Sequence, residues 1–516
     1  MTLEKATDHR DFRKLEDSRI ERHDRYNFEA KIDYLIQETQ EKKTSYLLEF
    51  YLFIPQVLQI NKKTYNKEEF FLDLNNRIRF KTPEMTFDGL INEKNDLSPL
   101  NIIQEEIEKI EFGKISQEVK TRIERELRLM ACMIKVLLRD QISYFLSNYD
   151  KLQKTCNVSE LVREFLQKLN TFQTHLNSLR DKFLIAQIPF KLKEGFQFCQ
   201  EYISLQVEKW TTSLLKYLGE KLENDVRESI IEIIEREQKR RKNLNKRSMV
   251  ELDDSGNETY SYYKGILKKY VQGVLYLEKK VNDPKSPLSQ VLYSLAEGVA
   301  MFFSLFLTFA IVSNFIDYSL PFIVGAIVVY MLKERLKDNA KLISDKALGL
   351  IFPDKRHEII DEFYQQKIGL SKEMVSFLEG ENIPSEILKI RRSSNQSPLE
   401  EKGKPEKVLS YRQKITLHNR EIEELHTKKN SLTNIIRFNT RDFLKYMDDP
   451  YEPISRWNKN KDKLTILDIS NVYHLNVIYK LTSFKGTKDE EVHFDKFRII
   501  LDQNGIKRVE DAQFTL

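Results

Sequence analysis

The chain has 516 residues, of which 41% are apolar and 32% are charged, and its formal net charge is only +5. So small an excess of positive charge argues against a nucleic-acid-binding protein, whose domains usually carry clustered basic residues. Gly (15) and Pro (13) are scarce, which favours an α+β fold that is mostly α, because these residues interrupt helices. Three widely spaced cysteines, Cys132, Cys156 and Cys199, form no C-x-x-C motif and are expected to fill apolar positions.

The first 60 residues divide into a charged segment and an apolar one. Residues 1–25 carry charges throughout and are expected to form a flexible tail. Within 26–60, the stretches 28–36 and 45–54 are rich in aromatic and β-branched residues, and the polar stretch 37–44 separates them. This order predicts a β-hairpin segment.

The region 61–250 is predicted to be a cytoplasmic helical domain. Apolar residues recur there at steps of mostly three and four, as on one face of a helix: Ile123, Leu127, Met130, Ile134, Leu137 and Leu138. No strict heptad persists beyond about three repeats, which favours packing as a bundle over one long coiled coil.

A basic run closes this helical region. Residues 236–247, REQKRRKNLNKR, contain seven Lys or Arg, and Lys239, Arg240, Arg241 and Lys242 form a candidate basic patch. Such a patch could contact anionic lipid at a membrane surface. The alternatives are a solvated helix end, where cations complement the helix dipole, and a nucleic-acid contact, which the small net charge disfavours.

The most informative stretch is the apolar block 291–332, in which Asp317 is the only charged residue except Glu297. A membrane span needs about 20 mostly apolar residues, and the whole block as one helix would measure about 63 Å, roughly twice the hydrocarbon thickness. We therefore predict a two-helix transmembrane hairpin within 260–350, with spans at about 291–312 and 316–332. A buried hairpin in a soluble protein is the alternative, although the first arm has no polar stripe at helical spacing.

Flanking charges predict the orientation of this hairpin. Lys279 and Lys280 precede it and Lys333 and Arg335 follow it, whereas the turn has no Lys or Arg. The positive-inside rule then places both flanks and both termini in the cytoplasm. Glu297, inside the first arm, is expected to pair with Lys333 near the same depth on the second arm.

The remainder is predicted as a helix and a flexible linker over 351–407, followed by a C-terminal cytoplasmic domain with β-hairpins over 408–516. Strand-like stretches occupy 472–482 and 494–501, and Asn504-Gly505 indicates a type I′ turn. Because β-hairpins are expected at both chain ends, and termini often lie close together, we expect the two ends to pair into one sheet.

Catalytic and ligand-binding motifs are missing from the sequence. It contains no G-x-x-x-x-G-K-[ST], G-x-G-x-x-G, G-x-S-x-G or H-E-x-x-H, so no cofactor, metal or catalytic residue is predicted. The layout favours a membrane-anchored scaffold, sensor or tether that faces the cytoplasm and binds the lipid bilayer together with protein partners or further copies of itself. The alternatives are a membrane-associated enzyme with a scattered active site and a pore-forming effector with Glu297 in its lumen.

Overall fold

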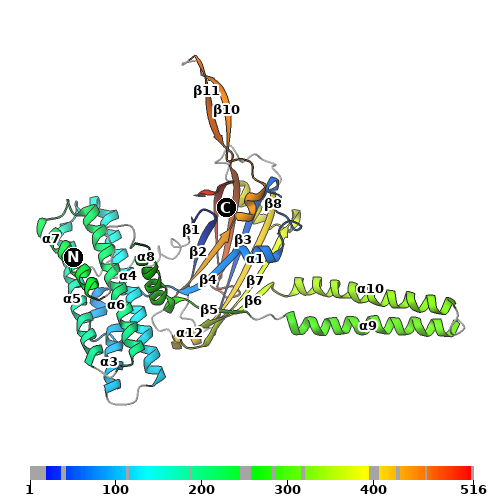
Figure 1. The fold of residues 1–516 in the computed structure, drawn as a ribbon, viewed down its shortest axis with the longest axis horizontal. Coiled ribbons are helices and arrows are strands. Elements are labelled where there is room, and N and C mark those ends of the chain that lie inside the picture. The colour runs from blue at the N-terminus through cyan, green and yellow to red at the C-terminus, as the bar shows by residue number, and fades with distance from the viewer. Residues whose placement is uncertain are drawn as a thin grey trace.

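The computed structural model describes residues 19–35, 42–111, 116–185, 188–244, 257–281, 285–314, 320–393, 406–425, 431–458 and 462–512. A β-sandwich occupies the centre of the molecule, and a helical bundle lies on one side of it (Figure 1). A long helical hairpin projects from the opposite side, and a two-stranded ribbon projects from one end of the sandwich. The fold is therefore α+β, as predicted. Most of the predicted N-terminal tail lies outside the described residues.

An antiparallel sheet of eight strands forms one layer of the sandwich, in the order β14-β13-β12-β3-β8-β7-β6-β5. Its strands are β3 (Lys43–Pro55), β5 (Glu278–Val281), β6 (Lys355–Asp361), β7 (Gln366–Leu378), β8 (Glu406–His418), β12 (Tyr473–Ser483), β13 (Glu491–Asp502) and β14 (Gly505–Asp511). β3, from the first part of the chain, lies between β8 and β12 from its last part. The prediction that the two chain ends share a sheet is confirmed.

The second layer is a sheet of four strands. In sheet order they are β1 (Arg19–Arg22), β2 (Asn27–Leu35), β9 (Ser431–Asn439) and β4 (Leu74–Phe80). The predicted hairpin between 28–36 and 45–54 is wrong, because β2 pairs with β9 while β3 belongs to the other sheet. The two strands instead face each other across the core, where the rings of Tyr34 and Tyr46 lie 4.9 Å apart. Two sheets can bury the apolar faces of both strands, which an isolated hairpin cannot.

The position of β3, which is covered on both faces, explains why its sequence is an almost continuous apolar run. Every second residue from Tyr46 to Ile54 packs into the core between the two sheets. Tyr51 and Phe53, on the opposite face, pack under α11 (Ser385–Ser393) against Ile387 and Ile390. A strand covered on both faces loses the alternation of polar and apolar residues that marks a half-exposed strand.

A bundle of helices occupies most of the range 61–250 and extends to Gln272. Its helices are α3 (Pro99–Glu111), α4 (Gln117–Leu152), α5 (Val158–Ile185), α6 (Phe190–Leu218), α7 (Asn224–Leu244) and α8 (Asn257–Gln272). The predicted stripe on α4 is largely buried, and Ile123, Ile134 and Leu138 are fully so. Cys132 and Cys199 fill apolar positions as expected, whereas Cys156, in the loop after α4, is exposed. Strand β4 was not predicted within this helical region.

Short helices connect the larger elements. They are η2 (Gln56–Leu58), α1 (Lys67–Asp73), α2 (Phe87–Ile91), η5 (Gly273–Leu275), η6 (Gly380–Asn382), α12 (Asn419–Leu425) and η7 (Arg441–Tyr446). α1 begins with a reciprocal capping box between Asn66 and Glu69, which satisfies two backbone N–H groups at the helix start. η5 links the bundle to the sheet, because α8 leads through it into β5.

The predicted helix and linker over 351–407 are wrong for most of that range. The structure has β6, β7 and α11 there, and 394–405 lies outside the described residues. β7 alternates between buried and more exposed residues over most of its length, which is the pattern of a strand. Nor do the strands of 408–516 form a separate domain, since they pair with strands from both other parts of the chain.

The C-terminal hairpin forms as predicted, but its turn differs. The turn residues between β13 and β14 are Gln503 and Asn504, and neither has a positive φ, which excludes type I′. Gly505 instead begins β14 with a φ of +123°, next to a shift in register. A glycine is required there because residues with a Cβ rarely adopt such a conformation.

Candidate functional site

The helical hairpin is an insertion at the edge of the eight-stranded sheet. It consists of α9 (Lys285–Asn314) and α10 (Leu320–Ile351), which project together from the sandwich (Figure 1). The strand before it, β5, and the strand after it, β6, are antiparallel neighbours, with Val281 opposite His357. The whole hairpin thus connects two neighbouring strands at one edge of the sheet.

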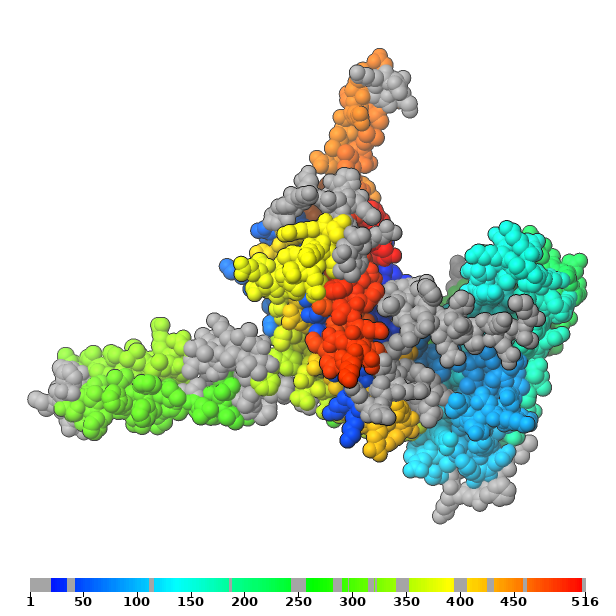
Figure 2. All heavy atoms as spheres, turned by 180° about the vertical axis from the view of Figure 1, so that it is seen from behind, coloured from blue at the N-terminus to red at the C-terminus, as the bar shows by residue number. Residues whose placement is uncertain are grey.

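The surface of the hairpin is apolar and exposed. Figure 2 shows it standing clear of the rest of the molecule. Along α9 and the first part of α10 the exposed side chains are Val291, Leu295, Val299, Met301, Phe302, Phe303, Leu305, Phe306, Phe309, Val312, Leu320, Ile323, Val324, Ile327, Val328, Tyr330, Met331 and Leu332. Soluble proteins rarely expose a continuous apolar surface of this size.

One helix in the described part of the chain is long and apolar enough to cross a membrane. It covers Gln290–Ser313, 24 residues, and only 6% of its most apolar stretch is buried inside the molecule. A core helix of a soluble protein would be mostly buried, so the alternative of a buried hairpin does not fit this exposure. The apolar part of α10 that the structure describes runs from residue 320 to 332, which is shorter than a span needs.

The two arms contact each other along one narrow face. Ala300 and Val329 are buried between them, and a Cβ at Gly325 would lie 3.0 Å from the side chain of Ile311. Small residues at such positions let two helices approach closely, as in helix pairs within membranes.

The predicted polar pair between the arms has a different partner. Glu297 Oε1 lies 3.2 Å from Lys337 Nζ, one helical turn beyond Lys333. Lys333 lies over the ring of Tyr330, with its Nζ 5.8 Å from the ring centroid. The choice of lysine depends on how the two arms are aligned, which the sequence does not specify.

Buried polar contacts hold the root of the hairpin. Lys279 on β5 lies 3.5 Å from Glu373 on β7, and Gln413 on β8 donates to Ser371 Oγ at 3.0 Å. Burial lowers the pKa of Lys279, and it also lowers that of His357 on β6. The contact of Lys279 thus ties β5, the strand that precedes the hairpin, to the interior of the eight-stranded sheet.

The candidate basic patch is not a continuous cationic surface. Lys239 and Lys242 are exposed, but Arg241 is only 2% exposed and packs against α6. Its guanidinium donates to Ser204 Oγ at 2.8 Å and pairs with Glu208. Arg240 donates to Asn177 on α5 at 3.0 Å. Two of the four predicted residues therefore stabilise the packing of α7 in the bundle.

This assignment predicts a stability defect for Arg241→Leu. Removing the guanidinium leaves Glu208 without its ion-pair partner in the bundle, which should destabilise the protein by about 3 kcal/mol. Lys242→Leu is the control, because its exposed side chain should change stability by less than about 0.5 kcal/mol. Thermal unfolding of both variants, followed by helical circular dichroism, checks this. Equal stability of the two would contradict the packing role of Arg241.

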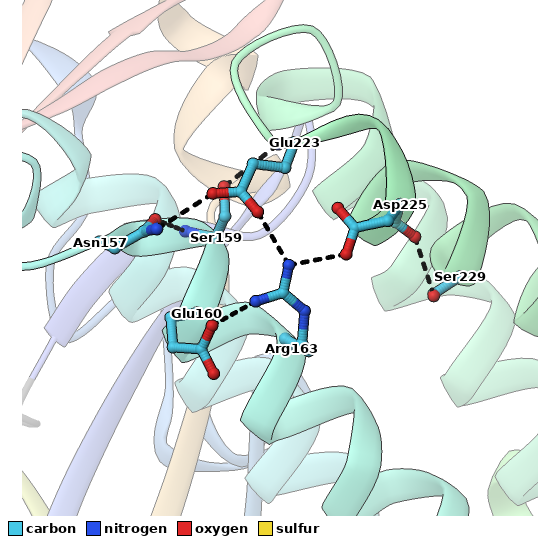
Figure 3. A network of polar contacts seen from close by, with 7 residues as sticks. All are labelled: Asn157, Ser159, Glu160, Arg163, Glu223, Asp225 and Ser229. Atoms are coloured by element: carbon cyan, nitrogen blue, oxygen red, sulfur yellow. Dashed lines mark hydrogen bonds and ion pairs between the residues drawn. The ribbon is translucent and has the colours of Figure 1, made fainter.

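A second polar network joins the first turns of α5 to the start of α7 (Figure 3). Arg163 on α5 pairs with Glu160, with Glu223 at 2.8 Å and with Asp225 at 2.7 Å. Hydrogen bonds from Asn157 and Arg163 lower the pKa of Glu223, and the bond from Arg163 lowers that of Asp225. Carboxylates held ionised in this way are poor proton donors, and we interpret the network as a clamp between α5 and the start of α7.

Side chains that could bind a metal ion do not gather within the described ranges, where no group of three or more His, Cys, Asp or Glu residues has suitable placement.

No protein-family model, curated protein or solved structure matches this chain.

Proposed function

We propose that the protein is a membrane-anchored scaffold or tether, with the hairpin as a two-span anchor and the bundle and sandwich on the cytoplasmic side. The observation that carries the proposal is the exposed apolar surface of α9. Only 6% of the most apolar stretch of this helix is buried inside the molecule. The hairpin's position between two neighbouring strands at the edge of the sheet supports the same role. Exposure of this apolar surface to water is unfavourable, and the hydrocarbon interior of a membrane would cover it.

The two-span arrangement is supported by the way the hairpin is attached. β5 and β6 are paired neighbours, so α9 leaves the sandwich and α10 returns to it at the same side of a membrane. Lys279 and Lys280 lie before α9, and Lys333 and Arg335 lie in the returning half of α10. Basic residues at both ends favour the cytoplasm for this side.

Two charge substitutions on α9 test the anchor. Phe302 lies in the middle of the candidate span and Val291 near its start, and their side chains are 67% and 55% exposed. In a bilayer, Phe302→Arg should oppose insertion by about 2.5–3.5 kcal/mol, whereas the arginine of Val291→Arg can reach the head groups. We expect only Phe302→Arg to shift the protein out of the carbonate-resistant membrane fraction.

The alternative of a hairpin in water makes the opposite prediction. Both side chains are exposed to solvent, so both variants would then fractionate alike. A reporter fused at the turn between α9 and α10 provides the control for topology, and it should report the outside in wild type and in Val291→Arg.

The ribbon at the end of the sandwich is a second exposed apolar element. It consists of β10 (Tyr451–Asn458) and β11 (Lys463–Ser470), and it points across the direction of the hairpin (Figure 1). Trp457 pairs with Leu464 and Ser455 with Ile466, which places three large apolar side chains on one face. A ribbon across the hairpin lies along the plane of the proposed membrane, where other copies of the anchored chain lie. We infer that the ribbon contacts a second copy.

This inference predicts weaker self-association for the double variant Trp457→Ser with Ile466→Ser. Burying one such side chain contributes about 1.5–3 kcal/mol, so the cross-linked dimer should fall by about tenfold or more. Cross-linking of the full chain in vesicles measures this effect. Arg456→Ser, on the other face of the ribbon, is the control and should leave the dimer unchanged. A monomeric wild-type chain would exclude a second copy as the partner.

A further inference from the structure

A cavity of about 360 Å³ opens beside the root of the hairpin. It lies between the segment around the start of α1 and the adjoining parts of β7 and β8, and this volume falls within the range of small-molecule sites. The residues around it are Lys62, Tyr65, Asn66, Lys67, Phe70, Val375, Ser376, Phe377 and Leu409.

The floor and the rim of this cavity differ in chemistry. Tyr65, Phe70, Val375 and Leu409 are apolar or aromatic and at most 2% exposed. The Tyr65 hydroxyl donates to Asp73 at 2.6 Å, so its polar end is already satisfied. At the rim the side chains of Lys62 and Lys67 are 64% and 52% exposed. An apolar interior with cations at its edge is complementary to a molecule with an apolar body and an anionic end.

The position of the cavity connects it to the hairpin. Lys67 Nζ lies 2.8 Å from Asp354 Oδ1, and the other oxygen of Asp354 accepts the backbone N–H of Val375 at 2.8 Å. Asp354 lies three residues after the end of α10. One residue at the hairpin root thus contacts both walls of the cavity.

We propose that this cavity binds an acyl chain that carries an anionic head group. The chain would occupy the space over Phe70, Val375 and Leu409, and Lys62 would meet the head group. Among the described residues, Lys62 forms one ion pair, a long contact of 3.8 Å to Glu379 in which both side chains are more than 60% exposed, so a ligand can replace it at small cost. The ligand could be a free fatty acid or an anionic phospholipid, and supply from a membrane rests on the proposed function. The match between the apolar cavity, Lys62 and an anionic acyl chain does not depend on that function.

Photolabelling of the full chain tests this proposal. The protein, in nanodiscs of zwitterionic lipid, receives either a diazirine fatty acid or a diazirine phosphatidylserine, and mass spectrometry locates the label after illumination. We expect label on peptides that contain residues 62–70 and 375–377, and removal of it by excess palmitate but not by the alcohol of the same length. Labelling by one probe only identifies the source.

Matched variants separate the cavity from general contact with lipid. Lys62→Glu should reduce the label there about five- to tenfold, because it replaces a favourable charge with a repulsive one. Lys63→Glu, an exposed neighbour that does not line the cavity, should leave the label unchanged.

Two results would overturn the proposal. One is label confined to α9 and α10, and the other is equal cavity labelling of Lys62→Glu and Lys63→Glu. A chain that proves soluble without detergent would refute the membrane anchor, yet the fatty-acid labelling could still be read in buffer, so the two ideas fail separately.

Discussion

A chain in which a short Gly-containing turn replaces residues 282–352 should be soluble without detergent and should keep the bundle and the sandwich intact. The replacement is feasible because β5 and β6 are antiparallel neighbours, so a short turn can connect them. Asp354 stays in place and keeps its contacts to Lys67 and Val375. Insertion contributes about 0.3–0.6 kcal/mol for each central Leu, Ile, Phe or Val, so removing the hairpin should abolish a strong membrane preference.

Carbonate extraction and circular dichroism together check this result. Wild type should stay with the membranes and the shortened chain should be released, with the lost helical signal limited to α9 and α10. Membrane attachment that persists in the folded, shortened chain would show that another surface is the anchor. The exposed Lys239 and Lys242 on α7 would then be the first candidates.

Gly505→Ala should strongly destabilise the sandwich. Gly505 has a φ of +123°, and a Cβ there would overlap the backbone oxygen of Arg25. That oxygen accepts the N–H of Ile506 at 2.7 Å, and the Arg25 side chain donates to Asn504 Oδ1 at 3.1 Å. Backbone strain together with these displaced contacts should destabilise the protein by about 3 kcal/mol.

Gly486→Ala is a matched control for the backbone strain alone. Gly486 has a φ of +88°, but a Cβ there would meet nothing within 4 Å. It should therefore lose only about 1–2 kcal/mol. Amide exchange shows where the damage falls: Gly505→Ala should speed exchange in β14 and also in β1 and β2, on either side of Arg25. Faster exchange limited to β13 and β14 would mean that the contact with Arg25 does not couple the two sheets.

Sequence patterns predicted those helices and strands that form because of the residue pattern within their own segment. The helical stripe that includes Ile123 and Ile134 predicted α4, because helical spacing places these residues on one buried face. The uncharged stretch from Gly298 predicted α9, because its length and composition alone suffice for a span. The strands β2 and β3 were also predicted, since β-branched and aromatic residues mark strands wherever their partners lie.

By itself, then, the sequence predicted helices such as α4 and α9 and strands such as β2 and β3, because periodicity and apolar length act within one segment, whereas it missed β4, β6 and β7. Only the tertiary structure decided which strands pair, because one strand pattern suits any partner that covers its apolar face, as β2 shows by pairing with β9. It also decided that Arg241 is buried, because Ser204 and Glu208 come from another helix. The cavity between α1 and β7 arises in the same way, since residues far apart in the chain form its floor.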